Sequence, residues 1–496
     1  MTPSALRHVL NRASAGSYTP RPPKLTSRAA SLIALLALLP FMCRCAFAAP
    51  GSRETRMQQP LAVHPTNPRY FTDGSGKAVY LTGSHTWNNL QHNGVYPPVA
   101  YDEYLDFLQK HNHNFIRMWA WEQGGWDPWA KDHVTVEPVP YARTGPGEAL
   151  DGEPKYDLTK LNDRYFQRLR SRVAAAQERG IYVSVMLFQG WSVEKKGQVG
   201  NPWHGHPFNK ANNVNGIDGD LNGDGQGPEI HTVDAPPAIL ELQHAYVRRV
   251  IATVNDLNNV LYEIGNEMHT GSVHWQYRMI DFIHDCEKTQ PQQHPVGMTG
   301  APIDNASLFA GPADWIAPTS RDGYNTDPPP ADGRKVIIAD VDHVWPKNFP
   351  QWPWKSFTRG LNTAFMDLYG ATKIGDKEIS ALKFVGDWLT NHDTVRRRLG
   401  HTLALANRIN LAAMTPRGDL SSTGYCLAAP GAEYVVYQPA EGAFRVKLEG
   451  QRRAFAVEWI HPETGISTPS TPVQAGGEVT FDPPFPGEAV LHLKAQ

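Results

Sequence analysis

The chain has 496 residues, of which 19% are charged and 10% aromatic, and its formal net charge is −2 with His neutral. This length exceeds one average domain and fits one large domain followed by a small one. The slight acidic balance argues against nucleic acid as a partner, because nucleic-acid binding selects basic surfaces, and four cysteines are too few for a disulfide scaffold.

The first 48 residues have the features of a secretory signal peptide. They contain six Lys or Arg and no acid, an apolar run over 29–42, and Ala46-Phe47-Ala48 as a cleavage site. The apolar run is short and is broken by Pro40, so a membrane anchor is the less favoured alternative. Cleavage would leave 41 Lys and Arg against 49 Asp and Glu. The sequence therefore predicts a mildly acidic, secreted or periplasmic protein with no membrane insertion after cleavage, and a polar, irregular linker over 49–66.

Residues 67–411 alternate between strand-like and helix-like patterns. An opening hairpin is expected over 69–81, with its turn at Asp73-Gly74-Ser75-Gly76. The candidate strands are 79–85, 114–120, 181–188, 259–266, 295–300, 315–319, 335–340 and 362–367. The candidate helices are 101–111, 161–179, 237–255, 274–288 and 394–410, from apolar periods near 3.6. Alternation implies parallel strands, and eight of them predict a closed (β/α)8 barrel of the TIM type; an open, doubly wound sheet is the alternative.

The connections after strands two, three and seven are long and rich in tryptophan. They span 121–157, 189–235 and 341–360, and barrel active sites are built from such connections. An exposed indole offers a flat face on which a sugar ring can stack, although packing within the loops is the alternative for each one. We expect two or three members of this group to touch a ligand: Trp121, Trp126, Trp129, Trp191, Trp203, Trp345, Trp352 and Trp354.

The second of these connections contains a calcium-loop pattern. Residues 218–229 match D-x-[DN]-x-[DN]-G-x5-E, and alternating oxygen donors can surround one hard cation. Pro228 and the preceding glycines exclude the exiting helix of an EF-hand, and an acidic, Gly-rich turn is the alternative. A register shifted to Asp220 would close at His231 instead. The predicted ligands of this structural Ca²⁺ are Asp218, Asp220, Asn222, Asp224 and Glu229.

The candidate fourth strand is the most informative segment of the chain. It reads Asn-Val-Leu-Tyr-Glu-Ile-Gly-Asn-Glu over 259–267, an apolar run that ends on an Asn-Glu pair. It resembles the fourth strand of retaining glycoside hydrolases of clan A, the cellulase-like (β/α)8 barrels, in which the Glu of this pair is the general acid/base. The resemblance implies that Glu267 is the general acid/base and that Asn266 is the Asn of the pair. A chance Asn-Glu at the rim of an ordinary buried strand is the alternative reading.

The second carboxylate departs from the family pattern. A retaining glycosidase needs two carboxylates about 5–5.5 Å apart, and the family places a Glu nucleophile at the end of strand seven. Here Asp340 holds the matching position, no Glu lies in the strand, and Asp342 shares its face. Three readings follow: an Asp nucleophile, a wider gap that admits water and inverts the product, or a degenerate site that only binds sugar. We favour a retaining hydrolase, with Asp340 ahead of Asp342.

Several other residues match the supporting positions of the family. Arg117 on strand two corresponds to an Arg that pairs with the nucleophile and keeps it ionised; a salt bridge without a catalytic part is the alternative. Tyr324, after strand six, is the candidate to hydrogen-bond the nucleophile. The predicted substrate-contacting set is Asn266, Arg117, His85, Trp87, Tyr324, His343 and Trp345.

Helical periodicity ends near residue 411. Short alternating runs follow at 432–437, 443–448, 454–460, 477–481 and 489–493, separated by turns, and predict a small antiparallel β-sandwich over 412–496. Cys286 and Cys426 could form one bridge or remain two buried thiols.

These features lead to a secreted glycoside hydrolase that acts on a poly- or oligosaccharide and needs no cofactor for its chemistry. The competing hypothesis is a decayed barrel that binds carbohydrate without cleaving it. Barrel chemistry of another kind would need a metal or phosphate site, and the sequence offers no such pattern beyond the calcium loop.

Overall fold

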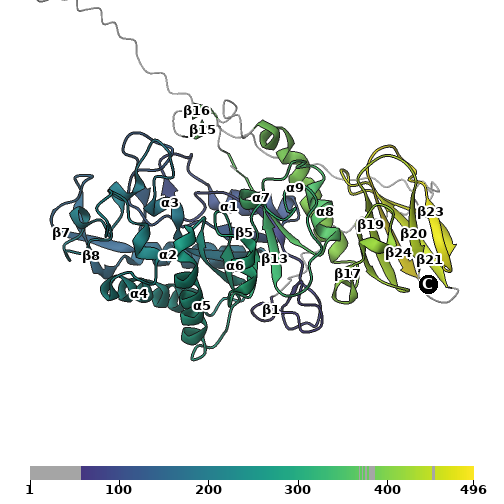
Figure 1. Ribbon diagram of the computed structural model, residues 1–496, viewed down its shortest axis with the longest axis horizontal. Coiled ribbons are helices and arrows are strands. Elements are labelled where there is room, and N and C mark those ends of the chain that lie inside the picture. Colours follow the sequence, from purple (N-terminus) through teal and green to yellow (C-terminus); the bar gives the residue numbers. More distant parts are fainter. Residues whose placement is uncertain (1–56, 368, 371–372, 375–376, 379–385, 449–452) are drawn as a thin grey trace, which may run out of the picture. The chain divides into compact units, whose positions relative to one another are not determined.

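A computed structural model of the chain describes residues 57–367, 369–370, 373–374, 377–378, 386–448 and 453–496 (Figure 1). The predicted signal peptide, residues 1–48, lies outside the described residues. Of the predicted linker over 49–66, the described part is not a linker: Ala62–Val63 (β1) pairs with Phe71–Thr72 (β2), and Leu61 is buried. The apolar Leu61-Ala62-Val63 run explains this packing. The predicted hairpin is confirmed by a bridge between Phe71 and Val79.

Eight parallel strands form the barrel. They are Thr82–His85 (β3), Phe115–Met118 (β5), Tyr182–Gln189 (β9), Val260–Asn266 (β10), Val296–Thr299 (β11), Trp315–Ala317 (β12), Val336–Asp340 (β13) and Asn362–Met366 (β14). Their order is β3-β14-β13-β12-β11-β10-β9-β5. The two end strands also meet, because the Asn114 N–H donates to the Thr82 carbonyl at 2.9 Å. The predicted barrel is therefore confirmed, and the open doubly wound sheet is excluded.

Helices cover the outside of the barrel (Figure 1). The five that the sequence predicted are Tyr101–Lys110 (α1), Asp163–Glu178 (α2), Pro237–Val254 (α4), Val273–Glu287 (α5) and Gly386–Ala406 (α9). In α2 the buried positions Tyr165, Leu169, Val173 and Ala176 recur at helical spacing, and the Asn162 side chain caps its first turn. Asn305–Ala310 (α6) and Trp352–Thr358 (α8) were not predicted, since they are too short for a periodic pattern.

The barrel interior changes character along its axis. Inward-facing side chains near the amino ends of the strands, such as Phe115, Leu261 and Ile338, form an apolar cluster. One inward step further along the same strands stand Arg117, Glu263 and Asp340, all fully or almost fully buried. Because inward positions alternate along a strand, this layer of charge lies directly above the apolar plug and towards the carboxyl ends.

The long connections fold into small elements of their own. After β3 and β5 come His92–Asn93 (β4), Val136–Glu137 (β6) and the hairpin of Tyr141–Glu148 (β7) with Pro154–Leu161 (β8). After β9 come Gly190–Val193 (α3) and short 3-10 helices at Pro202–Gly205, Lys210–Asn212 and Pro228–His231, and another 3-10 helix, Thr270–Ser272, follows β10. Val341–Val344 (α7) follows β13, and Lys373–Ile374 (β15) pairs with Lys377–Glu378 (β16).

The C-terminal segment is antiparallel, as predicted. Its six-stranded sheet contains Thr415–Pro416 (β17), Cys426–Ala429 (β18), Glu433–Gln438 (β19), Ala454–Ile460 (β21), Ser467–Gln474 (β22) and Ala489–Ala495 (β24). Phe444–Leu448 (β20) pairs with Gly477–Phe481 (β23), and the two sheets share one apolar cluster. The strand β22 was missed because nearly all its residues are exposed and polar. Short 3-10 helices lie at Leu411–Ala413 and Gly418–Leu420.

Two further findings concern the described residues. Cys286 is half-buried and Cys426 is buried, and both are free thiols, so the bridge that the sequence left open does not form. No helix within the described ranges is both long and apolar enough to cross a membrane.

Candidate active site

Arg117 organises the charged layer of the barrel. Its Nε and Nη2 both donate to the carboxylate of Glu263, and Nη2 also donates to the Asn266 Oδ1 at 2.7 Å. Its Nη1 donates to the Asp340 Oδ2 at 2.9 Å and lies 3.5 Å from the Asp342 Oδ2. Burial opposes its charge, but these carboxylates raise the pKa of Arg117 further above its usual range. One guanidinium thus contacts both aspartates that the sequence proposed.

Asp340 is an ionised carboxylate without free access to solvent. Its Oδ2 accepts from His85 Nε2 at 2.8 Å as well as from Arg117, and its Oδ1 accepts from the Asp342 backbone N–H at 3.0 Å, which caps α7. The residue is 0% exposed. Although burial alone would raise it, the neighbouring His85 and Arg117 hold the pKa of Asp340 below its usual range.

Asp342 is in a different state although it lies two residues away. Its side chain is 6% exposed, and its contacts with basic side chains are long, at 3.5 Å to Arg117 Nη1 and 3.7 Å to His343 Nε2. Burial and the nearby carboxylates of Glu267 and Asp340 raise the pKa of Asp342 well above its usual range. Of the two aspartates, Asp342 is therefore the one with spare hydrogen-bonding capacity, and its pKa is shifted in the opposite direction from that of Asp340.

Glu267 lies just past the tip of β10 in a strained backbone conformation. Its φ is 45°, a left-handed value that is uncommon outside glycine. Its Oε2 accepts from the Trp191 Nε1 at 2.9 Å, and the residue is half-buried. Burial raises the pKa of Glu267, while the charge of Lys196 and the indole hydrogen bond offset part of that rise. A carboxyl group that keeps its proton near neutral pH is what a general acid needs.

The connection after β9 supplies a residue that the sequence did not identify. The Lys196 Nζ donates to the backbone carbonyl of Glu267, and it lies 4.9 Å from the centre of the Trp191 ring. Burial lowers the pKa of Lys196, and the charge of Glu267 opposes that shift. Gly190 completes the support, because a Cβ there would lie 2.1 Å from the Glu267 carbonyl oxygen. No motif signals Lys196, since it lies in an aperiodic connection.

Asn266 is held from both sides, in agreement with its predicted place in the site. Its Oδ1 accepts from Arg117 and from the His343 Nε2 at 2.9 Å, and its amide donates to Gln189 at 3.3 Å. Burial lowers the pKa of His343 to about 3, with the charge of Arg117 acting in the same direction. His343 is therefore a neutral donor that orients Asn266, rather than a proton-transfer group.

The predicted role of Tyr324 is wrong. The connection between β12 and β13 carries it to the outside of the barrel, where it lines an opening with Asp322, Phe309 and Ile337. On β13 the side chain of Ile337 lies on the opposite face from that of Asp340, which points inward. This opening therefore faces away from the charged layer. His85 makes the hydrogen bond that Tyr324 was expected to make.

The tryptophans divide into two groups. Trp87 was predicted to contact substrate, but it is 8% exposed and packs against Tyr96 and Trp119. The loop residues Trp121, Trp203, Trp352 and Trp354 are buried as well. The half-buried members are Trp126, Trp129, Trp191 and Trp345.

A carboxylate with two imidazoles stands beside this cluster and was also missed. Glu122 lies 3.3 Å from His231 Nε2 and 3.5 Å from His206 Nε2, and it accepts from the Gln189 N–H at 2.8 Å. Although burial opposes it, the two imidazoles lower the pKa of Glu122 to about 2. The His206 Nδ1 accepts from the Phe208 N–H, so its proton is on Nε2, which excludes that nitrogen as a metal ligand. Within the described residues, no group of three or more His, Cys, Asp or Glu side chains is arranged to hold a metal.

The proposed calcium loop is closed by its own hydrogen bonds. The Asp220 carboxylate accepts from the backbone N–H groups of Gly223, Asp224 and Gly225. The Asn222 amide donates to Glu229 at 2.6 Å. These oxygens point to amides rather than to a common centre, and calcium binding stays a prediction.

Comparison with known proteins supports the fold. A family model described as a domain of unknown function (DUF6298) matches residues 107–302, which include Arg117, Glu263 and Glu267. No curated protein matches the sequence. A solved family 5 glycoside hydrolase from Bacteroides vulgatus has a TM-score of 0.57 at 11% identity, over 88% of this chain and 93% of its own. Another solved structure, described only as a glycoside hydrolase, has a TM-score of 0.55 at 12% identity, over 88% and 97%. A third, from Bacteroides vulgatus and described as a proposed glycoside hydrolase, has a TM-score of 0.57 at 14% identity, over 88% and 83%. The barrel with its C-terminal β-domain is thus an architecture that glycoside hydrolases use.

Proposed function

We propose that this protein is a glycoside hydrolase that cleaves O-glycosidic bonds of a poly- or oligosaccharide outside the cytoplasm. The observation that carries the proposal is the arrangement around Arg117, which joins two strand-seven aspartates to the end of the strand that presents Glu267. The structural neighbours described as glycoside hydrolases support the same reaction class. The basic and apolar pattern of residues 1–48 supports export.

In this mechanism Glu267 is the general acid. Burial raises the pKa of its carboxyl group and so favours the protonated form, which gives its proton to the glycosidic oxygen as the bond to the anomeric carbon breaks. The Trp191 indole fixes the orientation of the carboxyl group, and Lys196 holds the backbone behind it. After the leaving group departs, the same carboxylate takes a proton from the incoming water, as microscopic reversibility requires.

Asp342 is the second carboxylate of the mechanism, and this reverses the order that the sequence suggested. Asp340 is fully buried, and its oxygens accept from His85, Arg117 and the start of α7. Asp342 lies towards the rim and is partly accessible, and the charge of Glu267 helps to raise its pKa. Arg117 Nη1, 3.5 Å away, favours the ionised form of Asp342, so the proposal assigns the proton of the two interacting carboxyl groups to Glu267 and the nucleophile role to Asp342. Asp340 then positions Arg117 and the turn that bears Asp342.

The test is hydrolysis of a panel of aryl glycosides and neutral polysaccharides by the full chain. Glu267→Gln keeps the shape but removes the proton donor, and we expect a loss of roughly 10²–10⁴-fold on substrates with poor leaving groups. Wild-type turnover in that variant would end the assignment of Glu267. A protein that binds these sugars but cleaves none would instead be the decayed, carbohydrate-binding barrel.

A further inference from the structure

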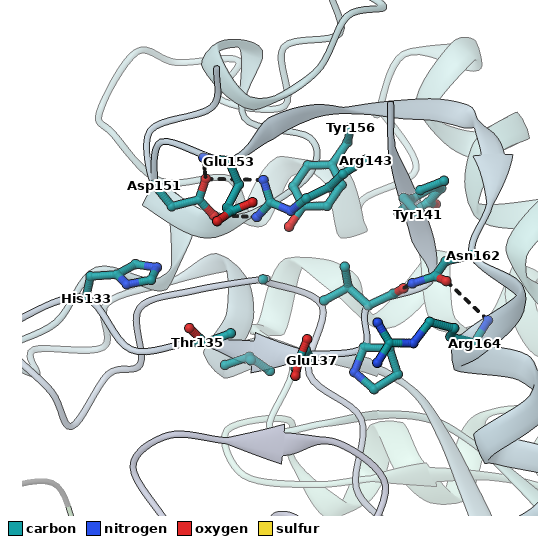
Figure 2. Close-up of a pocket in the computed structure, with 15 residues that line it drawn as sticks. His133, Thr135, Glu137, Tyr141, Arg143, Asp151, Glu153, Tyr156, Asn162 and Arg164 are labelled. Carbon is teal, nitrogen blue, oxygen red and sulfur yellow. Dashed lines mark hydrogen bonds and ion pairs between the residues drawn. The ribbon is translucent and has the colours of Figure 1, made fainter. Parts of the chain in front are cut away.

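A second cavity lies outside the carboxylate cluster, in the connection between β5 and α2 (Figure 2). Its volume is about 480 Å³, within the range of ligand sites in proteins. The walls come from β6, from the β7–β8 hairpin and from the start of α2, and no residue of the Arg117 cluster lines it. Neither the family model nor the proposed mechanism assigns it a use.

One wall is rigid because its polar groups are already paired. The Arg143 guanidinium donates to Asp151 and to the Pro154 carbonyl, and it lies 4.1 Å from the centre of the Tyr156 ring. Gly124 is required for this packing, since a Cβ there would stand 1.9 Å from the Tyr156 hydroxyl oxygen. The wall is therefore preformed, and ordering it on binding costs little conformational entropy.

The facing wall carries polar groups that are still available (Figure 2). Thr135, Glu137 and Arg164 line the cavity with exposed side chains, and these side chains hydrogen-bond no other described residue. Together they offer a hydroxyl, a carboxylate acceptor and a guanidinium donor. The cavity thus has one fixed wall and one wall with free hydrogen-bonding capacity.

The charges of the cavity narrow the class of ligand. The lining carries Arg143, which pairs with Asp151, and Arg164, together with two further carboxylates, Glu137 and Glu153. Arg168, at the edge, donates to the Glu137 carbonyl, so three cations stand with three carboxylates. A phosphate or a cation would find no excess of opposite charge here. A neutral polyhydroxylated ligand fits, because each of its hydroxyl groups both donates and accepts hydrogen bonds and can pair with donors and acceptors alike.

The cavity is connected to the carboxylate cluster through aromatic and polar contacts. His133, which lines it, packs 4.8 Å from Trp126. Three residues further along the same loop, Trp129 lies 5.3 Å from Trp191, whose indole donates to Glu267. Half-buried indoles offer faces to sugar rings. The loop that lines the cavity at His133 therefore also carries Trp129, which packs on Trp191 beside Glu267.

We propose that this cavity is an accessory site for a neutral oligosaccharide segment, and that it holds the polymer whose cleavage is proposed at Glu267. The inference rests on the proposed function for the identity of the polymer, and on the cavity itself for the binding. It assigns the β7–β8 hairpin a role in retaining long substrates rather than in the chemistry.

Affinity electrophoresis of the full chain tests the proposal, in gels that contain galactomannan, xylan or mixed-linkage β-glucan. Thr135→Trp fills the cavity from an exposed position, and Thr144→Trp is the matched control, since Thr144 lies exposed on β7 in the same connection but does not line the cavity. We expect wild type and Thr144→Trp to be retarded equally by at least one polymer, and Thr135→Trp to lose about tenfold in affinity, as expected for about 1.4 kcal/mol.

A second pair of variants protects the test against misfolding. Arg164→Ala removes a free donor of the cavity, while Lys131→Ala removes one positive charge from the same connection outside it. Only the first should weaken retardation. Equal retardation of Thr135→Trp, Arg164→Ala and wild type would overturn the proposal, as would the absence of retardation by every polymer that the wild type hydrolyses. Retardation that depends on the cavity in a protein that cleaves no glycoside would refute the hydrolase proposal but leave the accessory site standing.

Discussion

Adding a single methyl group at Gly190 should lower catalytic activity while the protein still folds. Gly190 begins α3 directly after β9, against the backbone of Glu267. A Cβ at this residue would lie 2.1 Å from the Glu267 carbonyl oxygen and 2.7 Å from its carbonyl carbon. Since close-packed contacts below 3.0 Å essentially do not occur, Gly190→Ala must push the two segments apart by about 1 Å.

That displacement acts on the acid directly. Trp191, the next residue, donates its indole N–H to Glu267, so a shift of α3 moves the donor while the backbone contact moves the carboxyl group. Misplacement of a reacting group by 1 Å costs on the order of 10²-fold in rate. Overpacking of this kind also costs about 1–3 kcal/mol of stability, which a folded barrel tolerates.

The assay is kcat/KM for Gly190→Ala on the best substrate of the glycoside panel, with melting temperature measured alongside. Gly94→Ala is the control, because its nearest contact would be an ordinary 3.4 Å to the Val134 Cβ. We expect a folded Gly190→Ala with a large loss of activity and a nearly unchanged Gly94→Ala. Full activity of Gly190→Ala would show that the backbone of Glu267 is not held where catalysis needs it, and the reasoning would fail.

Three further predictions follow from the cluster and the acidic loop. Lys196→Met removes a positive charge beside Glu267, which disfavours the carboxylate, so the pKa of Glu267 rises and activity should persist to higher pH; Lys196→Arg should restore the original pH profile. Asp342→Ala should abolish hydrolysis, and azide should partly restore cleavage by forming a glycosyl azide of inverted configuration, whereas NMR of the first-formed anomer from the wild type should show retention; azide rescue of Asp340→Ala would return the nucleophile role to Asp340. If the loop 218–229 binds calcium in the folded state, millimolar calcium should raise the melting temperature, and an identical melting curve in chelator would remove calcium from the account.

The sequence predicted the barrel well because several of its strands, such as Tyr182–Gln189 and Val260–Asn266, are apolar runs separated by helical periods. All eight candidate strands are present, and Arg117, Asn266, Asp340 and Asp342 lie in one contact network. That part of the site could be inferred because each residue occupies a set distance along its own strand, and parallel strands place equal positions side by side.

The sequence could not show how deeply each side chain is buried or which residues it contacts in the folded protein. Parity placed Asp340 and Asp342 on one face, but it says nothing about which carboxylate is enclosed by α7, His85 and Arg117. Tyr324 was misplaced because the path of a connection between strands is not encoded in periodicity. Lys196 was missed for the same reason, since only the folded connection brings it to the Glu267 carbonyl.

The charged layer also explains why the acid keeps its proton. Four carboxyl groups, those of Glu263, Glu267, Asp340 and Asp342, lie around the single guanidinium of Arg117, with Lys196 as the other nearby cation. Burying unpaired charge in a barrel is costly, and even with His85 against Asp340 the partners of positive charge, Arg117, Lys196 and His85, are fewer than the four carboxyl groups. Asp340 takes the strongest pairing, so the excess falls on the Glu267 and Asp342 pair, whose pKa values rise together. Burial and the excess of carboxyl groups over cations raise the pKa values of Glu267 and Asp342. The same excess therefore favours a proton that can be transferred to the glycosidic oxygen.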